Sequence, residues 1–408
     1  MNYFKSLFSV CAVLALFSCS QQQRPETNVL DESLTFADQQ FSNAMQITSD
    51  PNKIPRTLDK NRDLTTVGIY NWTSGFFAGN LWYMYKLTGE EKWKNEAVRW
   101  TEALDTIQYW SGNHDVGFMI GDSYGLGIRF DNRKQYEPVM VQTAESLCKR
   151  FNETTQCLES WNYRKAWDGK TEWFFPVIID NMMNLELLFE ASKISGNQRY
   201  YDVAVTHANT TMKNHYRPDY SCYHVVDYDE KTGEVKDKAT CQGFTDESSW
   251  ARGQAWGLYG YVLCYRYTKD AKYLDFAEKI ASFILDNPRL PKDLVPYWDY
   301  NANMDGWNPE WKYNKADYPV IPRDASAAAI TSSALFELAT YVTDKGYREK
   351  ATDMLMSLAN NYKADPANNK YFILDHSVGS LPHSAEIDVP LVYADYYFLE
   401  AIDRYRNM

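Results

Sequence analysis

A helical hairpin that recurs along the chain constrains the fold more than any other feature of the sequence. Its marker is a short polar turn, followed by an aromatic residue and then by apolar residues three and four positions apart. This spacing is typical of a helix with one apolar face. The marker occurs at 87–93, 131–136, 194–201, 267–273 and 342–347. Each occurrence predicts a junction between two neighbouring helices.

The helix before a turn is more apolar than the helix after it. The clearest apolar runs are 75–85, 177–191, 253–267 and 325–340. A helix that is apolar on nearly all sides must be buried, whereas a helix with one apolar stripe covers another element. Repetition of inner helix, turn and outer helix predicts an all-α fold, an (α/α)6 toroid or barrel of helical hairpins. The spacing of the turns leaves room for five or six hairpins. Only near 223–229 do apolar and polar residues alternate as in a β-strand, so we expect a strand there.

The N-terminus has the pattern of an export signal over residues 1–18. Lys5 precedes an apolar run at 7–17, which is shorter than the roughly 20 residues needed to cross a bilayer. The run ends in a sequence that resembles a bacterial lipoprotein cleavage box, which makes Cys19 the lipidated first residue of the mature protein. An ordinary signal peptide with an incidental cysteine is the alternative. We expect a flexible tether at 19–30 and a single folded domain at 31–408.

This leader predicts a protein anchored by lipid in the cell envelope of a Gram-negative bacterium. The absence of acidic residues directly after Cys19 favours the side that faces the periplasm. No other segment is apolar for long enough to cross a membrane. We expect an otherwise soluble monomer.

Charge and aromatic content narrow the classes of ligand. The 54 Asp and Glu residues outnumber the 42 Lys and Arg residues, which gives a net charge of -12. This balance argues against a nucleic-acid binder, whose affinity rests on basic groups. The 13 Trp, 31 Tyr and 19 Phe residues suit a protein that stacks against sugar rings, and a large aromatic core would account for them equally well.

Cysteine and histidine spacing shows no metal or cofactor site. The five cysteines of the folded domain have no C-x-x-C pair, so buried free thiols are expected, with a Cys222–Cys241 bridge left open. The six histidines have no H-x-x-x-H pair, and there is no glycine-rich phosphate loop. One group approaches the density of a metal site, and we interpret it as a loop over a cleft: His376, His383, Glu386 and Asp388.

Asp180 is the strongest local signal for a functional site. It lies within an apolar run that begins near Pro176, a residue suited to the first turn of a helix, and Asn184 follows one turn later. A buried carboxylate without a partner is costly, so it needs either a partner or a function. The alternative is that Asp180 binds free amides at the helix start. The helix start favours the anion and apolar surroundings favour the neutral acid, so the sequence leaves the charge state open.

A second carboxylate, Asp115, follows His114 in a loop before another predicted inner helix. A simple helix cap is the alternative reading. Enzymes that hydrolyse sugars nevertheless commonly use a pair of carboxylates, and these two lie at equivalent places on neighbouring inner helices.

Three large side chains gather at the start of a further inner helix. Arg252 and Trp256 are four residues apart and share a helix face, and Trp250 precedes them. Arginine suits a carboxylate and tryptophan suits a ring face. The alternative is a pair of core tryptophans with a surface arginine.

Together these motifs resemble unsaturated glucuronyl hydrolases, glycoside hydrolase family 88. The resemblance runs from about Asn71 to Ala401. It covers W-T-S-G-F-F at 72–77, H-D-V-G-F at 114–118, Asp180 with the run that follows it, His224, Gln242, and W-A-R-G-Q-A-W at 250–256.

The resemblance implies an enzyme without a cofactor. Its substrate would be an oligosaccharide made by a polysaccharide lyase from a glycosaminoglycan, with a 4,5-unsaturated uronic acid at its non-reducing end. The enzyme would remove that sugar by adding water across the double bond. Asp180 would be the general acid and base, and Asp115 would bind hydroxyls and support positive charge. Substrate contacts would come from Trp72, His114, Trp161, His224, Gln242, Trp250, Arg252 and Trp256.

Two other functions remain open at this point. An unsaturated rhamnogalacturonyl hydrolase, which acts on pectin fragments, shares the toroid and the type of substrate. A lipid-anchored glycan-binding protein without catalysis would also use an aromatic groove, although binding alone does not require Asp115 and Asp180.

Overall fold

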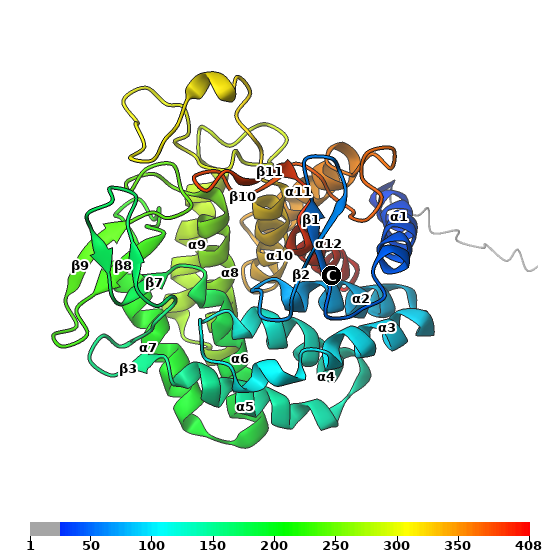
Figure 1. Cartoon of the computed structure of the whole chain (residues 1–408), viewed down its shortest axis with the longest axis horizontal. Coiled ribbons are helices and arrows are strands. Elements are labelled where there is room, and N and C mark those ends of the chain that lie inside the picture. The colour runs from blue at the N-terminus through cyan, green and yellow to red at the C-terminus, as the bar shows by residue number, and fades with distance from the viewer. Residues whose placement is uncertain (1–24) are drawn as a thin grey trace, which may run out of the picture.

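Inner helices form where the chain is apolar on nearly all sides. In the computed structural model, which describes residues 25–408, six inner segments form a closed ring (Figure 1). Each packs against the next, and the last packs against the first. The inner segments are α2 (Ser74–Thr88), η2 (Gly117–Gly125) continued by α4 (Leu126–Asp131), α6 (Asn181–Ser195), α8 (Ala251–Thr268), α10 (Ala325–Tyr341) and α12 (Val392–Arg406).

Outer helices, each with a more polar outward face, surround this ring. They are α1 (Pro25–Ile47), α3 (Glu91–Glu102), α5 (Glu137–Cys148), α7 (Gln198–Asn214), α9 (Ala271–Leu285) and α11 (Tyr347–Asn361). Short 3₁₀ turns are η1 (Asp105–Tyr109), η3 (Lys134–Tyr136) and η4 (Lys315–Asp317). The predicted (α/α)6 barrel is confirmed.

The N-terminal prediction is wrong in one part. Residues 25–30, expected as tether, belong to α1, and Leu30 is fully buried in the core. The helix packs against α11 and α2, so residues 25–30 belong to the folded domain. Residues 1–24, including Cys19 and the predicted export signal, lie outside the described residues. No helix within residues 25–408 is long and apolar enough to cross a membrane.

The second inner segment differs from an ordinary α-helix. The η2 segment is a π-helix of nine residues that continues directly into α4. Such wide helices are rare and often occur at functional sites. Gly117 opens it because a Cβ atom there would lie 2.4 Å from Asn184 Oδ1 on α6. The two inner segments therefore touch near their starts.

Short antiparallel strands occupy many of the connections. Pro176–Ile178 (β7), Val225–Tyr228 (β8) and Val235–Ala239 (β9) form one sheet. The hairpins are β1–β2 (Ile54–Leu58, Leu64–Val67), β3–β4 (Phe151–Asn152, Cys157–Leu158), β5–β6 (Arg164–Lys165, Glu172–Trp173) and β10–β11 (Ser377–Ser380, Ala385–Val389). Of the eleven strands within residues 25–408, the prediction covered only β8. Figure 1 shows β1 beside β11, although they are far apart in sequence.

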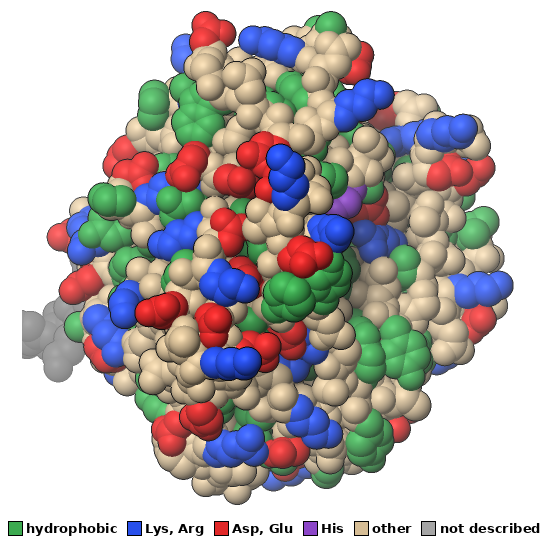
Figure 2. Space-filling model, turned by 60° about the vertical axis from the view of Figure 1, so that its left-hand side comes forward, with side chains coloured by type: hydrophobic (Ala, Val, Ile, Leu, Met, Phe, Trp, Pro, Cys, Tyr) green, Lys and Arg blue, Asp and Glu red, His purple; other side chains and the backbone are tan. Residues whose placement is uncertain are grey.

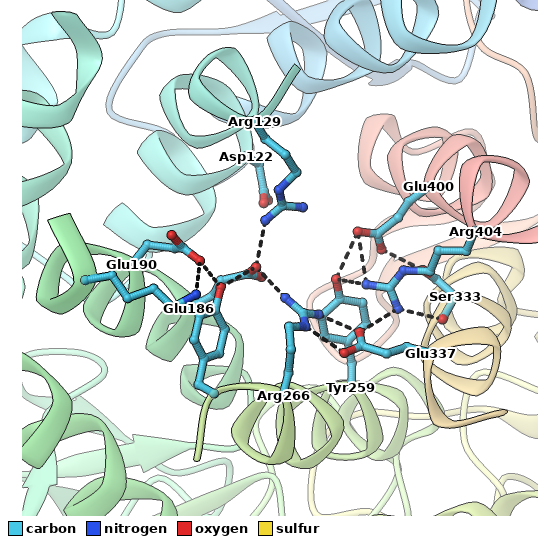
Figure 3. A network of polar contacts seen from close by, with 12 residues as sticks. Asp122, Arg129, Glu186, Glu190, Tyr259, Arg266, Ser333, Glu337, Glu400 and Arg404 are labelled. Atoms are coloured by element: carbon cyan, nitrogen blue, oxygen red, sulfur yellow. Dashed lines mark hydrogen bonds and ion pairs between the residues drawn. The ribbon is translucent and has the colours of Figure 1, made fainter. Parts of the chain in front are cut away.

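The interior of the barrel holds two distinct polar regions. One contains Asp115 and Asp180. The other contains an ion network formed by Arg129, Glu186, Arg266, Glu337, Glu400 and Arg404, whose side chains converge from five inner segments (Figure 3). A separate cavity of about 250 Å³ lies beside Arg129, Glu186 and Glu400. We call this region the ion-network end. The five cysteines of the described chain are buried and free, as expected.

Candidate active site

A cavity of about 350 Å³ contains most of the residues expected to carry function. The walls come from connections between helices and from the starts of inner segments. The wall residues are Arg56, Trp72, His114, Asp115, Trp161, Arg164, Ile178, Asp180, Cys241, Gln242, Arg252, Gly379, Ser380, His383, Ala385, Glu386 and Tyr393.

A strand delivers Asp180 to this cavity. Pro176, expected in a helix, begins β7 instead, because this segment pairs with β8. The Ile179 N–H then donates to the His224 carbonyl at 3.1 Å, and Asp180 is the residue directly before α6. Its side chain does not cap the helix, and its Oδ2 atom has no hydrogen-bond partner within residues 25–408. The capping alternative therefore does not hold.

Burial decides the protonation of Asp180. It raises the pKa of the carboxyl to about 7, against the positive charge of Arg252, which acts in the opposite direction. Of the two effects that the sequence left open, burial therefore outweighs the helix start, and the neutral acid is favoured. A carboxyl that titrates near neutral pH is able both to give and to accept a proton.

His224 presents an N–H group to Asp180. Its Nδ1 atom accepts hydrogen bonds from the backbone N–H groups of Cys241 at 3.0 Å and Gln242 at 3.1 Å. The ring hydrogen must therefore be on Nε2, which lies 3.7 Å from Asp180 Oδ2. Burial lowers the pKa of His224 well below its usual value, so the ring is neutral.

Asp115 lies where the η2 segment begins. His114 Nε2 is 3.3 Å from Asp115 Oδ1, and Asp115 makes no capping hydrogen bond to η2. Burial and the nearby charge of Asp180 raise the pKa of Asp115 to about 8, against the opposing charge of Arg150. Two carboxyls with raised pKa values therefore face one cavity.

The three arginines of the cavity have different surroundings. Arg56 forms a bidentate ion pair with Glu386, in which Nε and Nη2 donate to the two carboxylate oxygens at 2.5 and 2.7 Å. Arg252 bonds the carbonyls of Val378 and Gly379 and lies 3.2 Å from Asp324. Arg164 lies over the ring of Trp161 at 4.4 Å and, within residues 25–408, has no side-chain hydrogen bond or ion pair. It is the cavity arginine most available to an anion.

Not every predicted contact residue reaches the cavity. Trp72, His114, Trp161, Gln242 and Arg252 are on its wall with the two carboxyls. His224, Trp250 and Trp256 lie behind it.

The two indoles behind the wall belong to the core. Trp250 packs on the His224 ring at 4.7 Å, and Trp256 packs on Phe118 at 5.2 Å. Both are almost fully buried, so the predicted stacking of Trp250 and Trp256 on substrate is not supported by their positions.

Several wall residues carry no signal in the sequence. Arg56 and Arg164 lie in two-stranded hairpins too short for a recognisable pattern, and Tyr393 is the second residue of the apolar inner helix α12. The group at 376–388 is the β10–β11 hairpin, which contributes His383 and Glu386 to the wall, as expected of a loop over the cleft. Within the described residues, no group of three or more His, Cys, Asp or Glu side chains is arranged to hold a metal ion.

Comparison with known proteins gives a consistent result along the chain. The sequence model of Glycosyl Hydrolase Family 88 matches residues 47–404. An unsaturated glucuronyl hydrolase of Formosa agariphila is 44% identical over 95% of this chain and 94% of its own. An unsaturated chondroitin disaccharide hydrolase of Streptococcus pneumoniae is 32% identical, over 82% of this chain and 81% of its own.

The fold agrees with a solved structure as well. The crystal structure of an unsaturated glucuronyl hydrolase specific for heparin superimposes with a TM-score of 0.86 at 44% identity. The match covers 93% of this chain and 97% of that one.

Proposed function

The chain belongs to glycosyl hydrolase family 88 and is a glycosidase, and from this premise we propose that it acts on lyase-generated glycosaminoglycan fragments. It removes the 4,5-unsaturated uronic acid from their non-reducing end. The observation that carries this proposal is the pair of buried carboxyls, Asp115 and Asp180, which face one cavity with raised pKa values.

The reaction begins with proton transfer from Asp180 to C4 of the unsaturated sugar. Positive charge then develops at C5 and the ring oxygen, and Asp180, now a carboxylate, accepts a proton from the water that adds to C5. The resulting hemiketal opens to a C5 ketone, and the hemiacetal left at C1 releases the neighbouring sugar. No bond to the protein forms, and Asp180 regains its proton within one turnover.

The other residues of the site have separate roles. Asp115 binds sugar hydroxyls and, when ionised, stabilises the positive charge. The His224 Nε2–H group supports the Asp180 anion between the two proton transfers. Trp72 and Trp161 supply ring faces on the wall, and Arg164 is the free cation for an anionic group of the substrate.

The net charge of -12 does not oppose an anionic substrate. Acidic and basic side chains are interspersed over the face in Figure 2 and form no surface of one sign there. Fields of exposed charges fade over about 8 Å at physiological salt, so groups inside the cavity decide binding.

The alternative functions are not favoured. The relatives reported above are named for glucuronyl or chondroitin substrates rather than for pectin fragments. A protein that only binds glycans gains nothing from two buried carboxyls, whose desolvation costs stability.

The test is a reaction in D₂O with unsaturated disaccharides from chondroitin, hyaluronan and heparin. We expect loss of the ultraviolet absorbance of the double bond, release of the second sugar, and one deuterium at C4 of the uronic product. Release of that sugar with the double bond intact would exclude hydration. A flat trace with every disaccharide would leave only glycan binding.

The proposal for the N-terminus rests on sequence alone. We propose that residues 1–18 are removed, that Cys19 is lipidated, and that a monomer is held in the cell envelope facing the periplasm. Labelled palmitate should enter the parent and not the Cys19→Ser variant, which should be released on osmotic shock. Equal labelling of both proteins would exclude the anchor, and sedimentation of the released form measures its oligomeric state.

A further inference from the structure

Asn184 connects the two segments that carry the reacting carboxyls. It is fully buried on α6, one turn after Asp180, and it touches the start of η2. The proposed reaction gives this side chain no role. A buried amide requires partners for both its N–H groups and its oxygen, so its contacts indicate what it does.

The orientation of the amide follows from the backbone. The Phe118 N–H group donates to Asn184 Oδ1 at 3.1 Å. Because a backbone N–H has to meet the oxygen, the nitrogen of the amide must face the other way. There Asn184 Nδ2 lies 3.4 Å from Nδ1 of His114.

This contact determines which nitrogen of His114 carries its hydrogen. An amide N–H aimed at Nδ1 requires an unprotonated Nδ1, so the ring hydrogen is on Nε2. That atom lies 3.3 Å from Asp115 Oδ1. Burial and the charge of Arg150 lower the pKa of His114 to about 3, so the ring remains neutral in the range where the enzyme works.

We propose that Asn184 is a positioning residue whose amide selects the Nε2–H tautomer of His114, so that the N–H side of this ring, and not its lone pair, faces Asp115 Oδ1 at 3.3 Å. The chain of contacts from α6 through Asn184 and His114 then sets the position and charge of Asp115 relative to Asp180. This inference rests on the proposed function, because it matters for catalysis only if Asp115 takes part in the proposed reaction. The tautomer itself is measurable without substrate.

The titratable groups around this contact are few. Asp115 faces His114 from its own loop, Arg150 approaches from the turn between α5 and β3, and His207 approaches from α7. Asp180 acts on Asp115 from the position directly before α6. None of these supplies a second donor to His114 Nδ1 among the hydrogen bonds of the described chain.

Two variants of Asn184 separate the tautomer from simple packing. Asn184→Leu removes both amide groups at similar volume, and kcat should fall about 10- to 100-fold with little change in KM. Asn184→Asp keeps an acceptor for the Phe118 N–H group. When its carboxyl is protonated it also donates as the amide does, so activity should persist at acid pH and fall as this carboxyl ionises.

The decisive measurement is ¹⁵N NMR of the labelled imidazoles, with His114 assigned by comparison with His114→Gln. In Asn184→Asp, the His114 hydrogen should move from Nε2 to Nδ1 over the same pH range in which activity falls. The matched control is Asn80→Asp, because Asn80 is equally buried on α2 but bonds the Val392 carbonyl. It should leave the His114 tautomer and the shape of the pH profile unchanged.

Two results would overturn the inference. One is an Asn184→Asp protein that keeps the Nε2–H form at alkaline pH, and the other is one with the pH profile of the parent. If instead the parent were inactive on every disaccharide while the tautomer followed the variants, the proposed reaction would fail and the positioning contact would stand.

Discussion

The catalytic cavity and the ion-network end hold the same kind of group, a buried carboxyl on or just before an inner segment, in opposite charge states. In the cavity, burial raises the pKa of Asp180 to about 7 and that of Asp115 to about 8. At the ion-network end, guanidinium groups overcome the effect of burial, and the pKa values of Glu186 and Glu337 fall to about 2.

The difference lies in the partners. Arg266 donates to both Glu337 oxygens, at 2.6 and 2.5 Å, and to Glu186 at 2.6 Å (Figure 3). Asp180 has no comparable partner, because Arg252 is held by Asp324 and by two backbone carbonyls. The same scaffold thus uses paired carboxylates to join its helices and unpaired carboxyls to hold transferable protons.

The largest effect should come from Asp180→Asn. Removing the proton donor should lower kcat about 10²- to 10⁴-fold while substrate binding persists, because the group acts in the transition state. Asp122→Asn is the control at the ion-network end: burial also raises the pKa of Asp122 well above its usual value, but the carboxyl lies in the separate cavity. Its kcat should stay within about twofold of the parent. Equal losses of kcat in the two variants would show that the loss in Asp180→Asn does not come from proton donation inside the catalytic cavity.

The ion-network end should respond in stability. Glu337→Gln leaves Arg266 with a buried charge that is only partly compensated, which should cost about 3–5 kcal/mol of unfolding free energy in urea. Arg266→Met should cost a similar amount. The double variant should lose less than the sum of the two, because each single change leaves the other partner unpaired. Strict additivity would exclude a coupled network.

The sequence predicts the inner helices and the position of Asp180 better than it predicts how the chain enters the catalytic cavity. Apolar runs located four of the inner helices closely, since burial on all sides leaves a plain pattern at 75–85 and 253–267. Asp180 stood out because a charge in such a run is costly. Its entry through β7 was missed because the pairing partner, β8, lies about fifty residues away.

The direction of each pKa shift could not be predicted from the sequence. It depends on whether an arginine from another helix reaches the carboxyl, as Arg266 reaches Glu337 across 71 residues. Arg164 was missed for a related reason, since a strand of two residues shows no periodicity. Spacing predicts which residues share a helix, and long-range packing decides their charge.

The pH dependence of activity tests the cavity directly. The raised pKa keeps the Asp180 proton in place up to about pH 7, so kcat should fall at higher pH, by about tenfold per unit once the carboxyl is ionised. Arg252→Gln removes a charge that favours the anion, so this decline should move to higher pH even if the rate is lower. A decline centred near pH 4 would show that Asp180 is not buried in the working enzyme.

The smallest effect, in thermal stability, should have opposite signs at the two ends. A carboxyl whose pKa is raised on folding holds a proton that the unfolded chain releases above about pH 4, so Asp115 and Asp180 reduce stability increasingly up to about pH 8. The Asp115→Asn/Asp180→Asn protein should therefore melt at a higher temperature than the parent at pH 8, with the difference fading toward pH 4. Glu186 and Glu337 act in reverse: their contribution is present above about pH 4.5 and is lost as pH falls toward 2. Calorimetry of the double variant beside Glu337→Gln measures both signs, and a lower melting temperature for both at pH 8 would mean that the cavity carboxyls also stabilise the fold.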